Sequence, residues 1–160
     1  MPSFYTYAFL ILSFFLTATK ADRVNTITLE QLQSKTIKPE TNTLYVINFW
    51  ATWCKPCVEE LPYFETAGKK YPAEEVKILL VSLDFPSERE KVIKFVEKKN
   101  LQNEVYMLNA GNPNTWIDKI EPNWDGAIPA TLMYKAGSKI FFKEGDLTAA
   151  ELDSIIQTKK

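Results

Sequence analysis

The sequence contains no histidine and only two cysteines among its 160 residues. A structural zinc site needs four ligands, which this cysteine count cannot supply, so we expect no metal. The net charge of −1 gives no indication of a nucleic-acid partner or of a general anionic surface. Internal repeats and low-complexity segments are also absent. The length and the 46% hydrophobic content predict one domain with a single core.

The two cysteines, Cys54 and Cys57, lie in one stretch with two residues between them. The preceding run, 44–50, is apolar and rich in β-branched and aromatic residues, which predicts a buried strand. Beyond Cys57, apolar residues recur at helical spacing as far as Phe64. The cysteine pair is therefore predicted to lie where a strand gives way to a helix.

This position has chemical consequences for Cys54. The first N–H groups of a helix lack partners within the helix, and the helix dipole adds partial positive charge there, so a thiolate is stabilised. We expect Cys54 to have a lowered pKa and to act as a nucleophile, with Lys55 adding positive charge nearby. Pro56 fits the first turn of the helix. Cys57, one turn further in, can reach Cys54 and close a disulfide.

The pair allows two other interpretations. A purely structural disulfide would close too short a loop to restrain much of the unfolded chain. Inert buried thiols remain an alternative, but the start of a helix is a place that activates a thiol. A redox-active dithiol is therefore favoured.

The motif around the cysteines resembles a known family. The run Phe-Trp-Ala-x-Trp-Cys-x-x-Cys at 49–57 is similar to thioredoxins in general. Asn48 and the Cys-x-x-Glu-x-Pro pattern at 57–62 resemble the TlpA/ResA-type branch of extracytoplasmic thiol–disulfide oxidoreductases. The resemblance covers roughly residues 40–158. It implies an α/β thioredoxin fold, with a mixed central sheet flanked by helices and an extra strand and helix inserted at about 87–120.

The resemblance also suggests an acid–base group. Thioredoxins carry a buried aspartate six residues before the first cysteine, where this chain has Asn48, which cannot titrate. The branch uses a glutamate at the position of Glu60, which shares a helix side with Cys57. We expect Glu60 to accept and donate the proton, with a pKa raised by burial. The alternative is a solvated helix glutamate like Glu59.

A second element agrees with the first. In the thioredoxin fold a cis-proline faces the cysteines just before the last hairpin, and Ile128-Pro129 fits this place. The backbone of Ile128 would then hydrogen-bond an extended substrate segment. An ordinary trans turn proline is the alternative. Trp53 is interpreted as a partly exposed substrate platform, Trp50 as a core residue, and the role of Trp124 stays open.

The rest of the chain predicts an α/β order that ends in a hairpin and a last helix. Asp84, after its strand, is interpreted as a helix-entry residue, and Pro62 is expected to bend the helix that follows the cysteines. Capping boxes are predicted at Thr28 and Thr148. The other strands are expected at 24–28, 76–83, 105–108, 131–135 and 139–143, and the helices at 28–34, 55–71, from 86, at 112–120 and from 148.

Residues 1–21 differ in character from the rest. An uncharged apolar run at 4–16 is followed by small residues at Thr19 and Ala21, which is typical of a secretory signal sequence cleaved before Asp22. The run lacks a preceding Lys or Arg, and an uncleaved N-terminal anchor is the alternative. We expect a thioredoxin-like domain at 22–160, exported to the bacterial periplasm or another extracytoplasmic face.

Together these features predict an extracytoplasmic protein-disulfide oxidoreductase that needs no cofactor. The resemblance implies reduction of disulfides in exported partner proteins, for example during cytochrome c maturation, with electrons from an upstream membrane donor. One alternative is a peroxide reductase of the same fold, although the Pro/Thr-containing loop before the reactive cysteine of that group is absent. The other is a non-catalytic binding module.

Overall fold

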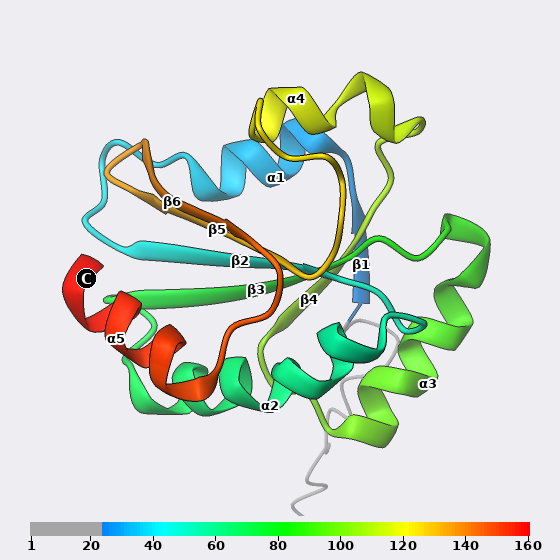
Figure 1. Ribbon diagram of the computed structural model, residues 1–160, viewed down its shortest axis with the longest axis horizontal. Helices are drawn as coiled ribbons and strands as arrows, with labels where there is room; N and C mark the ends of the chain where they lie inside the picture. Colours follow the sequence, from blue (N-terminus) through cyan, green and yellow to red (C-terminus); the bar gives the residue numbers. More distant parts are fainter. Residues whose placement is uncertain (1–23) are drawn as a thin grey trace, which may run out of the picture.

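The computed structural model describes residues 24–160, so the predicted signal sequence lies outside the described residues. Figure 1 shows a sheet with helices on both faces. Within the described part, no helix combines the length and apolar character needed to cross a bilayer. The elements are β1 (Val24–Ile27), α1 (Leu29–Thr36), β2 (Leu44–Trp50), α2 (Lys55–Lys70), β3 (Val76–Ser82), η2 (Pro86–Glu88), α3 (Arg89–Lys99), β4 (Glu104–Leu108), η3 (Pro113–Thr115), α4 (Ile117–Ile120), β5 (Ala130–Lys135), β6 (Ser138–Glu144) and α5 (Ala149–Lys159).

The six strands form one mixed sheet in the order β1-β4-β3-β2-β5-β6. β1, β4, β3 and β2 pair in parallel, whereas β5 and β6 are antiparallel. The segment predicted as an insertion, 87–120, supplies α3, β4 and α4, and β4 lies between β1 and β3. β2 and β3 end in register at Trp50 and Ser82, so the loops that follow them meet at one edge of the sheet.

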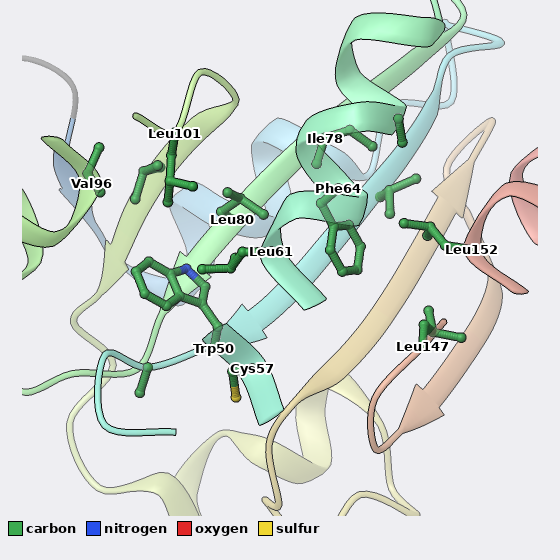
Figure 2. Close-up of a cluster of buried hydrophobic side chains, with 14 of the residues drawn as sticks. Trp50, Cys57, Leu61, Phe64, Ile78, Leu80, Val96, Leu101, Leu147 and Leu152 are labelled. Carbon is green, nitrogen blue, oxygen red and sulfur yellow. The ribbon is translucent and has the colours of Figure 1, made fainter. Parts of the chain in front are cut away.

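Helices cover the sheet in two layers. In Figure 1, α2, α3 and α5 lie below the sheet, and α1 and α4 lie above it. Side chains alternate along β2, so Val46 and Trp50 belong to the core under α2, whereas Ile47 and Phe49 belong to the core under α1 and α4. Figure 2 shows the first of these cores, with Cys57 at its edge. Because β2 is buried on both faces, its sequence is apolar or aromatic except at Asn48.

The local signals explain most of the element boundaries. Capping boxes are present at both predicted sites, Thr28 with Gln31 and Thr148 with Glu151. The β5–β6 hairpin turns through Ala136 and Gly137, whose φ angles are both positive. Positive φ at both central residues is the geometry that two-residue hairpin turns favour.

Candidate active site

Cys54 and Cys57 form a disulfide at the start of α2, with an S–S distance of 2.03 Å. Cys54 is the N-cap residue of α2, and its sulfur accepts a hydrogen bond of 3.3 Å from the backbone N–H of Cys57. Cys57 is fully buried, and Cys54 is 6% exposed. Cys54 is therefore the outer sulfur, and the N–H group aimed at it would stabilise a thiolate after reduction.

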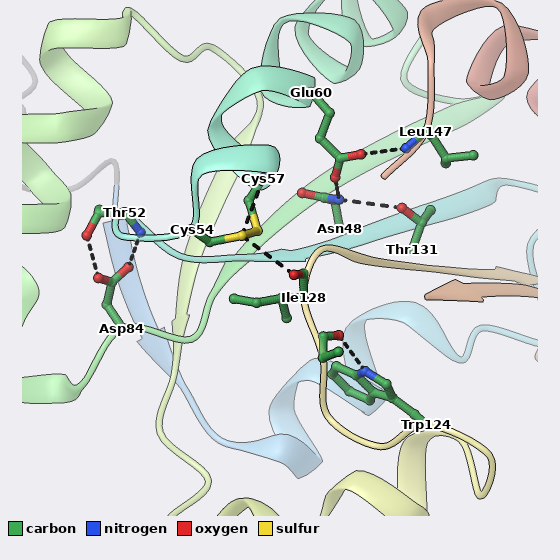
Figure 3. Close-up of a disulfide and its surroundings, with 11 residues drawn as sticks. Asn48, Thr52, Cys54, Cys57, Glu60, Asp84, Trp124, Ile128, Thr131 and Leu147 are labelled. Carbon is green, nitrogen blue, oxygen red and sulfur yellow. Dashed lines mark hydrogen bonds between the residues drawn. A yellow bond between two sulfur atoms is a disulfide. The ribbon is translucent and has the colours of Figure 1, made fainter. Parts of the chain in front are cut away.

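The proline loop faces this disulfide. The Ile128–Pro129 peptide bond is cis, as predicted. The carbonyl oxygen of Ile128 lies 3.6 Å from the Cys54 sulfur (Figure 3). This is a packing contact and not a hydrogen bond, because a disulfide sulfur carries no hydrogen. The two elements that the sequence predicted to meet are thus in direct contact.

Trp124, whose role the sequence left open, shapes the loop before the proline. It is buried, and its indole N–H donates to the carbonyl of Ala127 at 2.8 Å (Figure 3). The backbone N–H of Ala127 donates in turn to the carboxylate of Asp125. Gly126 has φ +94°, and a Cβ there would lie 2.8 Å from the end of the Ile117 side chain. The positive φ is the reason that the loop favours glycine here, because the end of the Ile117 side chain could shift to admit a Cβ.

Glu60 lies buried on α2, one turn after Cys57. One carboxylate oxygen accepts from the side-chain amide of Asn48 at 2.6 Å, and the other accepts from the backbone N–H of Leu147 at 2.8 Å (Figure 3). Desolvation raises the pKa of Glu60, although these two hydrogen bonds oppose the rise. The solvated alternative for Glu60 is therefore wrong.

Asp84 has a different position from the one predicted. It does not cap the following helix, because Phe85 is the N-cap residue of η2 and makes no side-chain capping bond. Instead the buried carboxylate accepts from the backbone N–H of Thr52 at 2.9 Å and from the Thr52 hydroxyl at 2.5 Å. The hydroxyl of Ser82 also donates to it at 2.8 Å. Asp84 therefore holds the turn that leads into Cys54.

The residues flanking Cys54 are mostly exposed. Trp53 is 61% exposed, in agreement with the predicted exposure of its side chain, whereas Trp50 is buried in the core as predicted. The Lys55 ammonium lies 3.8 Å from a Glu59 carboxylate oxygen in a solvated pair, so part of its charge is offset. Pro56 lies in the first turn of α2, where its missing N–H leaves no helical bond unmade.

A mostly apolar groove of about 620 Å³ includes Trp53, the neighbour of Cys54, in its lining. Trp53 and Ile128 lie at its active-site end, and Phe85, which is 73% exposed, forms part of a wall. Among the described residues that line it, Asp84 alone has an ionisable side chain, and that carboxylate is already hydrogen-bonded. The full lining is Trp53, Leu83, Asp84, Phe85, Pro86, Leu108, Asn109, Ala110, Gly111, Asn112, Pro113, Trp116, Ile117, Gly126 and Ile128.

The sequence reasoning missed the loop between β6 and α5. The N–H of Gly145 donates to the carbonyl of Pro129 at 2.8 Å, and the N–H of Leu147 donates to Glu60. This loop therefore connects the proline element with the buried carboxylate. Every residue except proline has a backbone N–H, so the sequence does not show which of these groups will donate to the site. The one local signal was the Gly-Asp pair after the last strand, which indicates a tight turn.

Comparisons with known proteins agree with this geometry. Residues 16–140 match the AhpC/TSA family. Thiol-disulfide oxidoreductase ResA of Bacillus cereus is 31% identical over 113 residues, which are 69% of this chain and 60% of that protein. Sporulation thiol-disulfide oxidoreductase A of Bacillus subtilis is 31% identical over 62 residues, 39% of this chain and 38% of that protein. The chain thus spans less than two thirds of the length of these relatives.

Solved structures support the fold. The crystal structure of StoA from Bacillus subtilis has a TM-score of 0.56 and 26% identity, covering 72% of this chain and 84% of that one. A thioredoxin-family thiol:disulfide interchange protein from Chlorobium tepidum has a TM-score of 0.62 and 22% identity, with coverages of 79% and 83%. The predicted thioredoxin fold is thereby confirmed. With its family match extending over most of the sequence, the chain belongs to the AhpC/TSA family and resembles the ResA-type proteins of thioredoxin fold.

Proposed function

We propose that the protein is a thiol–disulfide oxidoreductase that exchanges electrons with disulfides in partner proteins. The observation that carries the proposal is the Cys54–Cys57 disulfide at the start of α2, in contact with the carbonyl of Ile128. Dithiols in this position have one sulfur that is activated and one that is buried to resolve the intermediate. The relatives named thiol-disulfide oxidoreductases support the same chemistry.

The reaction takes two exchange steps. The Cys54 thiolate attacks a partner disulfide, so a bond forms between Cys54 and one partner sulfur while the other partner sulfur leaves as a thiolate. Cys57 then attacks Cys54, which closes the internal disulfide and releases the second partner sulfur. Glu60 accepts the proton that the Cys57 thiol loses. Two electrons have moved from the two cysteines to the partner, and the reverse order oxidises a dithiol.

The substrate is a polypeptide segment lying between Trp53 and the Ile128–Pro129 loop. Ile128 presents backbone groups beside the Cys54 sulfur, where an extended segment would pair with them. The exposed Trp53 and the uncharged groove walls offer apolar contact on one side of the reacting disulfide. We assign substrate binding to Trp53, Ile128 and Pro129 on these grounds.

For direction and place, we propose that the protein reduces exported proteins outside the cytoplasm, with cytochrome c maturation as one such process. The support is the ResA-type resemblance together with the apolar N-terminal run at 4–16. If the signal sequence is cleaved after Ala21, mass spectrometry of the exported protein should find Asp22 as the N-terminal residue. Recovery of the intact chain in the membrane fraction would favour the anchored alternative.

Exchange with a disulfide-bonded protein tests the proposed function. The wild-type chain, supplied with dithiothreitol, should speed reduction of a disulfide-bonded protein substrate. Cys57→Ala should instead accumulate a mixed disulfide with that substrate, and Cys54→Ala should do neither. Equal activity in Cys54→Ala and wild type would refute the proposal, and peroxide consumption without any protein partner would favour the peroxide-reductase alternative.

A further inference from the structure

Asn48 has a buried side-chain oxygen that accepts no hydrogen bond from the described residues. The side chain is fully buried in β2, and Oδ1 has no hydrogen-bond partner within 24–160. Its Nδ2 atom donates to Glu60 at 2.6 Å and, over a longer 3.4 Å, to the hydroxyl of Thr131. Most buried polar side-chain atoms have a partner, so an orphan acceptor beside a reactive disulfide calls for a chemical explanation.

Glu60 sets the orientation of this amide. An ionised carboxylate can only accept hydrogen bonds, so the Nδ2 end of Asn48 must face it. The Oδ1 end then points the opposite way, whatever lies there. Rotating the amide by half a turn would place Oδ1 against the Glu60 carboxylate oxygen, and both atoms are acceptors. Oδ1 therefore cannot gain a partner by this rotation while Glu60 is ionised.

The direction in which Oδ1 points is the side of Cys57. In Figure 3 the nitrogen of the Asn48 amide is turned to Glu60, and its oxygen is on the side where Cys57 is drawn. Cys57 and Glu60 are one turn apart on α2, a spacing that brings Cβ atoms to about 5–6 Å. Since Glu60 contacts Asn48 directly, Cys57 projects from the same helix face over the same part of β2.

In the disulfide, the Cys57 sulfur has no hydrogen to donate. Reduction adds one, and full burial of Cys57 favours the neutral thiol over the thiolate. We propose that, in the reduced protein, Asn48 Oδ1 accepts a hydrogen bond from the Cys57 thiol and so acts as a positioning residue between the resolving cysteine and Glu60. The hydrogen bond itself does not depend on the proposed function, but its role in thiol–disulfide exchange rests on that function.

The bond would act on the second exchange step. While it exists, it holds the Cys57 proton at the end of the Asn48 amide that faces away from Glu60, and it keeps the thiol neutral. When Cys57 attacks, its hydrogen bond to Asn48 breaks and its proton passes directly to Glu60. A Cys57–Cys54 bond forms, and the bond from Cys54 to the partner sulfur breaks, so that this sulfur leaves as a thiolate. The Asn48 amide neither gains nor loses a proton. It also favours the reduced state, because its oxygen is satisfied only there.

Infrared spectroscopy of the S–H stretch tests this contact directly. In Cys54→Ala, Cys57 is the only thiol in the chain, since the sequence has two cysteines. The S–H band of this variant should lie at lower frequency than that of an unbonded thiol, and Asn48→Leu in the same background should return it to the unbonded position. Thr131→Val is the matched control, because it removes a partner of Nδ2 only and should leave the band shifted.

An unshifted band in Cys54→Ala itself would overturn the proposal, even if Asn48→Leu fails to fold. So would a shifted band that Asn48→Leu leaves unchanged. In the full exchange-competent chain, Asn48→Leu should make the disulfide about two- to tenfold harder to reduce at equilibrium with dithiothreitol, the usual range for one hydrogen bond. If the S–H band is shifted but the wild-type protein catalyses no thiol–disulfide exchange, the proposed function is refuted and the hydrogen bond between Cys57 and Asn48 still stands.

Discussion

Burial and hydrogen bonding shift the pKa of the Glu60 carboxyl group in opposite directions. Desolvation is the larger effect and raises its pKa, while the Leu147 N–H and the Asn48 amide lower it. Two further charges face the group, with Asp146 raising the pKa and Lys143 lowering it. The carboxyl is thereby moved toward the pH at which it can exchange protons with a thiol.

The raised pKa of Glu60 predicts a pH-dependent stability. The folded protein holds this proton more tightly than the unfolded chain, so the contribution is fully present below the unfolded value of 4.5 and is lost as pH rises through the folded pKa. Relative to Glu60→Gln, the oxidised wild type should therefore lose stability as pH rises from 4 to 8. Urea unfolding of both proteins over this range measures the difference, in which groups common to both cancel. A constant difference, or one that moves the other way, would contradict the assignment.

Trp53 allows a test of substrate contact that leaves the fold intact. Because it is 61% exposed, Trp53→Ala should change the free energy of unfolding by no more than about 0.5 kcal/mol. Loss of an aromatic contact should raise KM for a protein substrate about five- to thirtyfold. Reaction with a small disulfide such as glutathione disulfide should be nearly unchanged.

The matched control for Trp53 is Tyr63→Ala, which removes another exposed aromatic side chain. Tyr63 lies on α2 and does not line the groove beside the disulfide. It should leave KM as in the wild type. Equal effects of the two substitutions would show that exposure of aromatics in general, and not the position of Trp53, explains the result.

Sequence reasoning succeeded for residues whose partners are close along the chain or fixed by a motif. The family resemblance predicts a buried Glu60 on the same helix side as Cys57 and a cis bond before Pro129, and the structure has both. Asp84 was misassigned because its partner Thr52 lies 32 residues away. A buried carboxylate after a strand looks the same in sequence as a helix cap.

At the scale of elements, the site depends on how α2 begins. The turn before α2 is held in place by Asp84, which follows β3. Its carboxylate accepts three hydrogen bonds from Thr52 and Ser82. The register of β2 with β3 brings these residues together, since Trp50 pairs with Ser82. The position of Cys54 is therefore fixed by the sheet edge as well as by its own helix.

Removing the Asp84 carboxylate should be costly for this reason. Asp84→Ala leaves the donors of Thr52 and Ser82 without their acceptor in a buried place, and we expect a loss of about 2–4 kcal/mol in the free energy of unfolding. Chemical denaturation of the oxidised protein measures it. Asp118→Ala, an exposed position on α4, is the control and should change stability by less than about 0.5 kcal/mol. An equally small change at Asp84 would mean that the turn does not depend on it.

On the scale of the whole molecule, the sheet places three separate segments around one disulfide. The cysteines follow β2, the proline loop precedes β5, and the loop after β6 supplies the N–H groups of Gly145 and Leu147. Hydrophobic periodicity predicts the strands and helices well, because burial on one or both faces decides their sequences. The order of strands, with β4 between β1 and β3, was not predicted, because local sequence patterns do not show which distant segments pair.

The central claim is that Cys54 and Cys57 form a reducing couple, and its reduction potential tests that claim most directly. Equilibrating the wild-type chain with redox buffers of known potential, and counting free thiols, gives the value. We predict a potential near that of thioredoxin, about −270 mV, at which the dithiol can donate electrons to partner disulfides. A value near about −120 mV, typical of a strong oxidant, would contradict the account and reverse the direction of electron flow.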